Sequence, residues 1–170
     1  MAGLGITGAG IIPAYARSED NNRYFPGHEL EGNHVQKFNM SGYAAPKLDT
    51  VRIGFIGTGN RGSAAVARMS KVGGVTIKAI ADLRTEKANA AKKKIEASNQ
   101  NPMIYSGNND EWKKVCERED IDLIYIATPW ELHTPMAVYA MNNGKHVCVE
   151  VPAATSLEEC WQLVETSERT

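Results

Sequence analysis

The chain has 170 residues, of which 42% are hydrophobic and 23% are charged, and its formal net charge is −1. This length suits one ordinary domain with a buried core. The near-zero charge argues against a nucleic-acid partner and against an anionic membrane surface. No apolar run reaches the roughly 18 residues of a membrane span. The three cysteines lack the spacing of a metal site or a disulfide framework, and we expect neither.

The N-terminal 49 residues differ in composition and periodicity from the rest of the chain. Residues 1–16 carry no charge and end in Ala14-Tyr15-Ala16, a small–x–small pattern typical of a signal-peptidase site. Because the basic start of a leader is missing, the segment is either a truncated export signal or a flexible extension. The first interpretation predicts an exported, periplasmic protein and the second a cytoplasmic one. Residues 17–49 are polar and keep no regular period, so we expect an extended arm or linker.

From Val51 onward, short β-rich runs alternate with stretches of good helix formers. The expected strands are residues 51–56, 75–81, 103–105, 121–127 and 146–150. The expected helices are residues 63–69, 85–97, 110–117, 135–142 and a last one that follows a capping box of Ser156 and Glu159. Gly144 suits the left-handed position after a helix end.

This alternation predicts right-handed βαβ units and therefore an α/β fold with a doubly wound parallel sheet of the Rossmann type. We place the dinucleotide-binding domain at residues 50–170. Because no strand follows the last helix before Thr170, we expect an incomplete sheet and a fragment of a longer enzyme whose substrate domain is absent.

A glycine motif, Gly-Thr-Gly-Asn-Arg-Gly at residues 57–62, directly follows the first strand and opens a helix. In a dinucleotide-binding turn each glycine has its own role. Gly57 makes the tight turn, Gly59 leaves room for a pyrophosphate, and Gly62 lets the helix pack closely on the strand. A methyltransferase that uses S-adenosylmethionine also has glycines here, but it usually lacks the third one.

Two further features support a dinucleotide. The backbone amides of Asn60 and Arg61 lie at a helix N-terminus, where the helix dipole favours a phosphate. Asp82 ends the second strand, where a carboxylate accepts hydrogen bonds from the adenosine ribose and repels a 2′-phosphate. NAD is therefore expected in preference to NADP, although Arg84 softens that preference. The alternative for Asp82 is a solvated turn residue.

A second group of candidate residues lies at the ends of the fourth and fifth strands, where open α/β sheets bind ligands. In the loop of residues 128–135, Trp130 can stack on a ring and His133 can donate or accept a proton. The alternative for His133 is a packed or capping residue. Glu150 is expected to point into the same crevice, with a surface acid as its alternative. The candidate cofactor contacts from these two strand ends are Thr128, Trp130, Glu131, Leu132, His133 and Glu150.

With these motifs, residues 51–170 resemble the Gfo/Idh/MocA family of NAD(P)-dependent sugar and polyol oxidoreductases. The resemblance rests on Ala-Thr-Pro at 127–129, Leu-His at 132–133, and Gly-Lys-His-Val at 144–147 leading to Glu-Val-Pro at 150–152. Two positions depart from the family pattern: Trp130 stands where Asn is usual, and Val151 stands where a lysine contributes to hydride transfer. With Gly-Tyr-Ala-Ala-Pro-Lys at 42–47, these departures resemble glycoside hydrolase family 109.

The resemblance implies an α-N-acetylgalactosaminidase that keeps NAD tightly bound and is often exported behind a twin-arginine signal. The implied reaction differs from hydrolysis by two carboxylates. A hydride passes from C3 of the sugar to NAD, a base removes the C2 proton, and the glycosidic oxygen leaves C1. Water then adds to the unsaturated intermediate and the hydride returns to C3. The pyrophosphate would contact Asn60 and Arg61, and the ribose would contact Asp82. The resemblance also implies that Val151, next to Glu150, contacts NAD.

Two other functions remain open at this stage. One is a conventional NAD-dependent sugar or polyol dehydrogenase, and the other is a nucleotide-binding fragment without catalysis. If the protein is an enzyme of either kind, we expect its partner to be a small-molecule carbohydrate, and a homo-oligomer is compatible with the sequence. The catalytic base and acid are expected beyond Thr170.

Overall fold

The structure is a computed structural model that describes residues 34–37 and 39–170. The predicted export signal at residues 1–16 and the arm as far as residue 33 lie outside the described residues. Among the helices that are described, none is both long and apolar enough to cross a bilayer.

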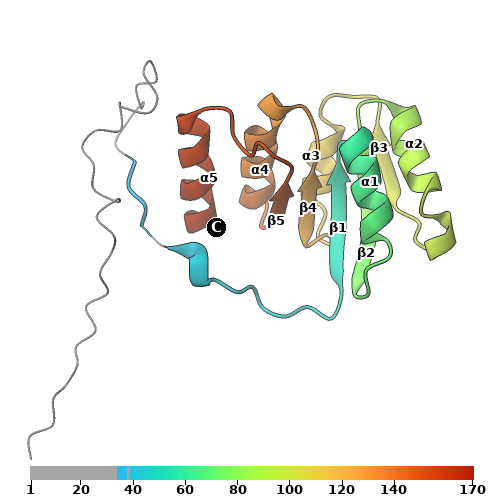
Figure 1. The fold of residues 1–170 in the computed structure, drawn as a ribbon, viewed down its shortest axis with the longest axis horizontal. Coiled ribbons are helices and arrows are strands. Elements are labelled where there is room, and N and C mark those ends of the chain that lie inside the picture. Colours follow the sequence, from blue (N-terminus) through green and yellow to red (C-terminus); the bar gives the residue numbers. More distant parts are fainter. Residues whose placement is uncertain (1–33, 38) are drawn as a thin grey trace, which may run out of the picture. The chain divides into compact units, whose positions relative to one another are not determined.

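The described residues form one five-stranded sheet in which every neighbouring pair is parallel. Its strand order is β3-β2-β1-β4-β5 (Figure 1). The strands are β1 (Val51–Ile56), β2 (Val75–Asp82), β3 (Met103–Ser106), β4 (Leu123–Ile126) and β5 (His146–Val149). The chain runs outward from β1 to β3, then returns to β4 on the other side of β1. The direction of winding therefore changes between β1 and β4, and a crevice is expected at the carboxyl ends of these two strands.

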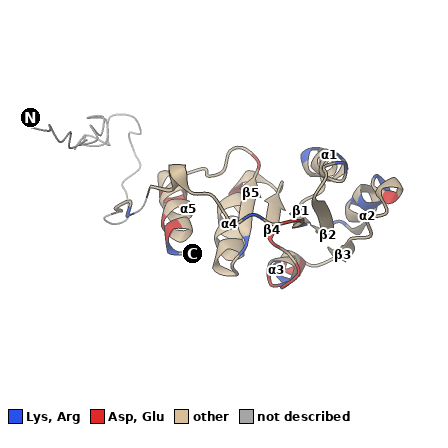
Figure 2. Ribbon diagram, turned by 90° about the horizontal axis from the view of Figure 1, so that it is seen from below, with Lys and Arg blue, Asp and Glu red and all other residues tan. Residues whose placement is uncertain are grey.

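Helices cover both faces of the sheet, as the doubly wound prediction requires. They are α1 (Asn60–Met69), α2 (Thr85–Lys93), α3 (Glu111–Cys116), α4 (His133–Asn142) and α5 (Leu157–Arg169), with short 3-10 turns at η3 (Met40–Gly42), η4 (Glu96–Ser98) and η5 (Trp130–Leu132). Figure 2 shows α1 and α2 on one side of the sheet and α3 and α4 on the other. The fold class predicted from the sequence is confirmed.

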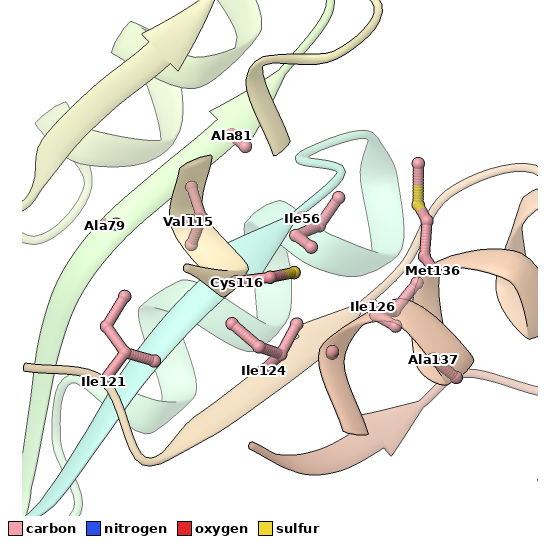
Figure 3. Close-up of a cluster of buried hydrophobic side chains, with 11 residues drawn as sticks. Ile56, Ala79, Ala81, Val115, Cys116, Ile121, Ile124, Ile126, Met136 and Ala137 are labelled. Atoms are coloured by element: carbon pink, nitrogen blue, oxygen red, sulfur yellow. The ribbon is translucent and has the colours of Figure 1, made fainter. Parts of the chain in front are cut away.

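The core is correspondingly divided into two clusters, one on each face. The first joins β1, β2 and β4 to α3 and α4, and Figure 3 shows Ile56, Val115 and Met136 among its members. The second packs α1 and α2 against the opposite face through side chains such as Phe55 and Val66. Strands buried on both faces explain why their sequences read as continuous apolar runs rather than alternating ones.

Element boundaries differ from the sequence prediction mainly where helices begin. α1 begins at Asn60, three residues before the expected start, and α4 begins at His133, two residues before Pro135. Pro135 is compatible with this start because the first amides of a helix have no partner within the helix. The predicted helix of residues 85–97 is split into α2 and η4. Gly144 adopts a φ of 71°, the left-handed conformation that its position predicted.

The capping box predicted at the start of α5 is formed, with hydrogen bonds from Thr155 to the Glu159 carboxylate. The Ser156 hydroxyl accepts the amide of Glu159 at 3.1 Å, as expected. The Glu159 carboxylate accepts the backbone amide and the hydroxyl of Thr155, at 2.6 and 2.7 Å. These bonds hold the pKa of Glu159 below its ordinary value. The start of α5 is thus fixed by side chains on both sides of the helix boundary.

Candidate cofactor-binding site

A cavity of about 530 Å³ opens at the carboxyl ends of the central strands, at the point where the winding reverses. Four segments supply its walls: the glycine turn after β1, the end of β2, the loop after β3 with the start of α3, and the loop after β4. The lining residues are Ile56, Gly57, Gly59, Asn60, Arg61, Ala81, Asp82, Leu83, Arg84, Tyr105, Asn108, Asn109, Glu111, Trp112, Ala127, Thr128, Pro129, Leu132 and Met136.

The three glycines of the motif differ in what surrounds them. Gly57 has a φ of 86°, and a Cβ there would lie 2.6 Å from the carbonyl oxygen of Ala127. A Cβ on Gly62 would lie 1.9 Å from the carbonyl oxygen of Gly57, so α1 packs directly on the turn. Around Gly59 nothing lies within 4 Å of a Cβ. The open space at Gly59 and the close packing at Gly62 agree with the roles expected of a dinucleotide-binding turn.

Asp82 is fixed by hydrogen bonds from two backbone segments. Its Oδ2 accepts the backbone amide of Thr58 at 2.7 Å and the Thr58 hydroxyl at 2.9 Å. Its Oδ1 accepts the amide of Arg84 at 2.9 Å. The Arg84 guanidinium is 3.9 Å away and more than half exposed, whereas the carboxylate of Asp82 is 9% exposed. The carboxylate therefore joins the glycine turn to the end of β2.

The part of the cavity next to β3 and α3 combines apolar and aromatic side chains with the polar side chains of Asn108, Asn109 and Glu111. Leu83, Tyr105 and Trp112 line it. The Tyr105 hydroxyl accepts a hydrogen bond from Arg118 at 3.1 Å, and the Trp112 ring packs edge-on against Tyr139 at 5.1 Å between centroids. Both aromatic side chains are thus held from outside the cavity. A flat heteroaromatic ring is well suited to a wall of this kind.

The residues present fit a dinucleotide. The glycine turn gives an open approach to the amides at the start of α1, where the partial positive charge favours a diphosphate. Arg61 adds a cationic side chain at this end, Asp82 provides an acceptor for a sugar hydroxyl, and the aromatic side chains accommodate a base. In the part of the chain that the structure describes, no group of three or more His, Cys, Asp or Glu side chains is arranged to hold a metal ion.

The structure brings together part of the predicted site. The candidates that line the cavity are Gly57, Gly59, Asn60, Arg61, Asp82, Thr128 and Leu132. Gly62 lies beneath the turn as a packing residue. The remaining candidates, Trp130, Glu131, His133, Glu150 and Val151, do not line it. Trp130 and Val151 are instead 61% and 83% exposed, and their contact with a cofactor stays a prediction.

His133 and Glu150 make contacts within the protein. The buried ring of His133 faces two carbonyl oxygens, that of Pro152 at 2.7 Å from Nδ1 and that of Thr128 at 2.9 Å from Nε2. It therefore ties the loop after β4 to the segment after β5, which agrees with the packed alternative. Glu150 accepts the Tyr125 hydroxyl at 2.6 Å. Burial, together with this bond, raises the pKa of Tyr125 to about 12.

Sequence reasoning missed the residues contributed by the loop after β3 and by α3. These are Tyr105, Asn108, Asn109, Glu111 and Trp112. The rule that ligands bind at the carboxyl ends of strands applies to β3 as it does to β2 and β4. This rule could have indicated the residues after β3. The position of β3 next to β2, however, is known only from the strand order in the structure.

Comparison with known proteins agrees with this geometry. The family model described as an oxidoreductase family with an NAD-binding Rossmann fold, Gfo/Idh/MocA, matches residues 51–170. The chain belongs to this family. The NAD-binding domain that the sequence predicted is confirmed by this match.

Relatives with similar sequences include glycosidases. The chain is 55% identical over 126 residues to a glycosyl hydrolase family 109 protein of Phocaeicola vulgatus. This alignment covers 74% of this chain and 27% of the relative. It is 51% identical over 133 residues to an α-N-acetylgalactosaminidase of Bacteroides fragilis, and this alignment covers 78% of this chain and 31% of the relative. A family 109 protein of Streptomyces filamentosus aligns over 99% of this chain and 34% of its own length, at 44% identity. The resemblance to family 109 is therefore confirmed.

A solved structure with the same fold is the myo-inositol dehydrogenase of Lactobacillus casei in complex with NAD(H) and myo-inositol. The TM-score is 0.62 at 25% identity, and the match covers 71% of this chain and 34% of that one. The chain thus spans about a third of the length of the proteins that it matches.

Proposed function

We propose that this chain is the NAD-binding part of a family 109 glycoside hydrolase that removes terminal α-N-acetylgalactosamine. The observation that carries the proposal is the cavity at the switch point, which is lined by the glycine turn, the anchored carboxylate of Asp82 and the aromatic side chains of Tyr105 and Trp112. The sequence identity of 51% to an α-N-acetylgalactosaminidase supports the substrate class.

Each end of the cavity has its own role in this proposal. The amides at the start of α1 and the side chain of Arg61 bind the diphosphate. Asp82 binds the adenosine ribose, and its negative charge disfavours a 2′-phosphate. The wall of Tyr105 and Trp112 holds the adenine. Such positioning is what the protein contributes, whereas bound NAD supplies reversible acceptance of a hydride.

The segment after β5 carries one of the two departures from the family pattern that resemble glycoside hydrolase family 109. Val151 follows β5 and is 83% exposed. It stands where the family resemblance leads one to expect a lysine that takes part in hydride-transfer chemistry. An aliphatic side chain cannot accept a proton, so in either reaction another residue must take the proton of the sugar hydroxyl that is oxidised.

Calorimetric titration of the purified chain with NAD and, separately, with NADP tests cofactor binding. We expect NAD to bind with at least tenfold higher affinity than NADP, because Asp82 repels the additional phosphate. Absence of any heat of binding with NAD would contradict the assignment of the cavity.

The activity is tested with the protein encoded by the complete reading frame. An aryl α-N-acetylgalactosaminide should release its phenol while no NADH accumulates, because a hydrolysis cycle returns the hydride to the sugar. The opposite pattern, with steady NADH formation from polyols and no phenol release, would assign a dehydrogenase instead.

A further inference from the structure

We propose that Thr58 is a positioning residue that aims Asp82 at the adenosine ribose. The inference rests on the proposed binding of NAD in this cavity and adds a residue to it. Thr58 is the second residue of the glycine motif and is 2% exposed. It does not line the cavity, so any effect on a ligand must pass through another residue.

The orientation of Asp82 depends on donors that lie on opposite sides of its carboxylate. Oδ2 accepts two donors from Thr58, the amide and the hydroxyl. Oδ1 accepts the amide of Arg84. The hydroxyl of Thr58 is the one side-chain donor among these three hydrogen bonds, and it can be removed without changing the backbone.

Counting lone pairs shows what remains for the ligand. A carboxylate offers about four acceptor positions, two on each oxygen. Both positions on Oδ2 are filled by Thr58, and one on Oδ1 is filled by Arg84. One acceptor position on Oδ1 remains free of these three hydrogen bonds, and Asp82 lines the cavity. Thr58 thereby directs the free acceptor of Asp82 toward a single ribose hydroxyl.

The same arrangement explains why an amide cannot replace this carboxylate. An Asn at position 82 would have one oxygen and one NH2 group. In either orientation, the NH2 group would face a backbone amide, of Thr58 or of Arg84, and two donors cannot bond to each other. The site therefore requires an acid at this position for the geometry of the turn as well as for the ribose.

The test compares Thr58→Ser with Thr58→Ala, because these two variants differ only in the hydroxyl. Both are titrated with NAD and with an NAD analogue whose adenosine ribose lacks the 2′ and 3′ hydroxyls. We expect the Ser variant to bind NAD within about twofold of the wild-type chain. The Ala variant should bind NAD about tenfold more weakly, the loss typical of one hydrogen bond to a charged group.

The analogue separates positioning from a general effect on the fold. If the hydroxyl aims Asp82 at the ribose, removing it should change the affinity for the analogue by less than about twofold. An equal loss for NAD and the analogue would overturn the inference, as would equal NAD affinities of the Ala and Ser variants. Thr76→Val removes a hydroxyl near the start of β2, away from the lining residues, and should leave both affinities unchanged.

Two controls keep the result interpretable. The thermal midpoints of the variants are compared, and Thr58→Val, in which a methyl group fills the place of the hydroxyl, replaces Thr58→Ala if the smaller residue prevents folding. If the wild-type chain itself binds no NAD, the proposed function fails. If the wild-type chain binds NAD and the variants show no selective loss, only the role of Thr58 fails.

Discussion

At the scale of single residues, Gly59 and Gly62 offer a matched test of two different requirements. A Cβ at position 62 would collide with a backbone carbonyl oxygen, which cannot move without displacing the turn. Gly62→Ala should therefore lower the free energy of unfolding by about 1–3 kcal/mol, the usual cost of overpacking. Chemical denaturation measures this change.

Gly59→Ala is the matched variant, because a Cβ at position 59 meets nothing within 4 Å. Gly59 has a φ of −61°, which lies outside the left-handed region that favours glycine. We expect its stability to stay within about 0.5 kcal/mol of wild type, while its affinity for NAD falls because the methyl group occupies the approach to the diphosphate. Unchanged NAD binding in this variant would show that the diphosphate lies elsewhere.

At the scale of elements, residues 34–37 of the arm are attached to α5 by a histidine. The ring of His34 stacks on Trp161 with 5.3 Å between centroids. Its nitrogens lie 2.8 Å from Glu165 and 3.0 Å from Glu158, and the amide of Lys37 donates to Glu168. Both ring nitrogens donate only when the imidazole is protonated. The contact therefore depends on the charge of one side chain.

This dependence predicts how the attachment responds to pH. Hydrogen bonding to Glu165, and then to Glu158, raises the pKa of His34 above its ordinary value of 6.5. The stabilisation from protonated His34 is then complete below pH 6.5 and is lost as the pH rises through the raised pKa. Titration of the His34 ring signals by NMR checks the direction, and Glu165→Gln should move the pKa back toward 6.5. A pKa at or below 6.5 in the wild-type chain would contradict the attachment.

At the scale of the whole molecule, the two ends of the sheet have different roles. The cavity lies at the carboxyl ends of the strands, whereas ion pairs hold the amino ends together. Arg52, near the start of β1, donates to Asp122 from its backbone amide and its guanidinium, at 2.8 and 2.5 Å. Arg118 and Lys78 both contact Asp120 in the connection that leads to β4.

These ion pairs predict the loss of stability in acid. The Arg52 guanidinium keeps the pKa of Asp122 below its ordinary value of 3.8, and Arg118 lowers the pKa of Asp120 to about 2. A carboxylate with a lowered pKa stabilises the fold above its unfolded value, and this contribution disappears as the pH falls toward the folded pKa. Stability should therefore fall from about pH 4 toward pH 2.

Asp122→Asn tests this separation of roles. We expect the free energy of unfolding at pH 7 to fall by about 1–3 kcal/mol, since charge-assisted hydrogen bonds between β1 and β4 are lost. The affinity for NAD should not change, because Asp122 lies at the opposite end of the strands from the cavity. Denaturation at several pH values and calorimetry with NAD provide the two measurements. A variant with weaker NAD binding and unchanged stability would contradict this division.

The sequence by itself determined the local features of this protein. Short apolar and β-rich runs located the five strands of the described residues, and the motif at residues 57–62 marked the phosphate-binding turn together with Asp82. These features could be predicted because they depend on neighbours within a few residues or on one βαβ unit. The predicted starts of α1 and α4 were less accurate, since a helix start depends on which of the first backbone amides find partners outside the helix.

Only the tertiary structure decided which strand ends share a cavity. Tyr105 and Trp112 line the cavity because β3 pairs with β2, whereas His133 does not line it because its ring is buried against two carbonyl oxygens. The contact between Asp82 and Thr58 was likewise not predicted from the sequence pattern, since Thr58 lies 24 residues away along the chain. Contacts between distant segments depend on the packing of the whole domain, and no local pattern of residues encodes them.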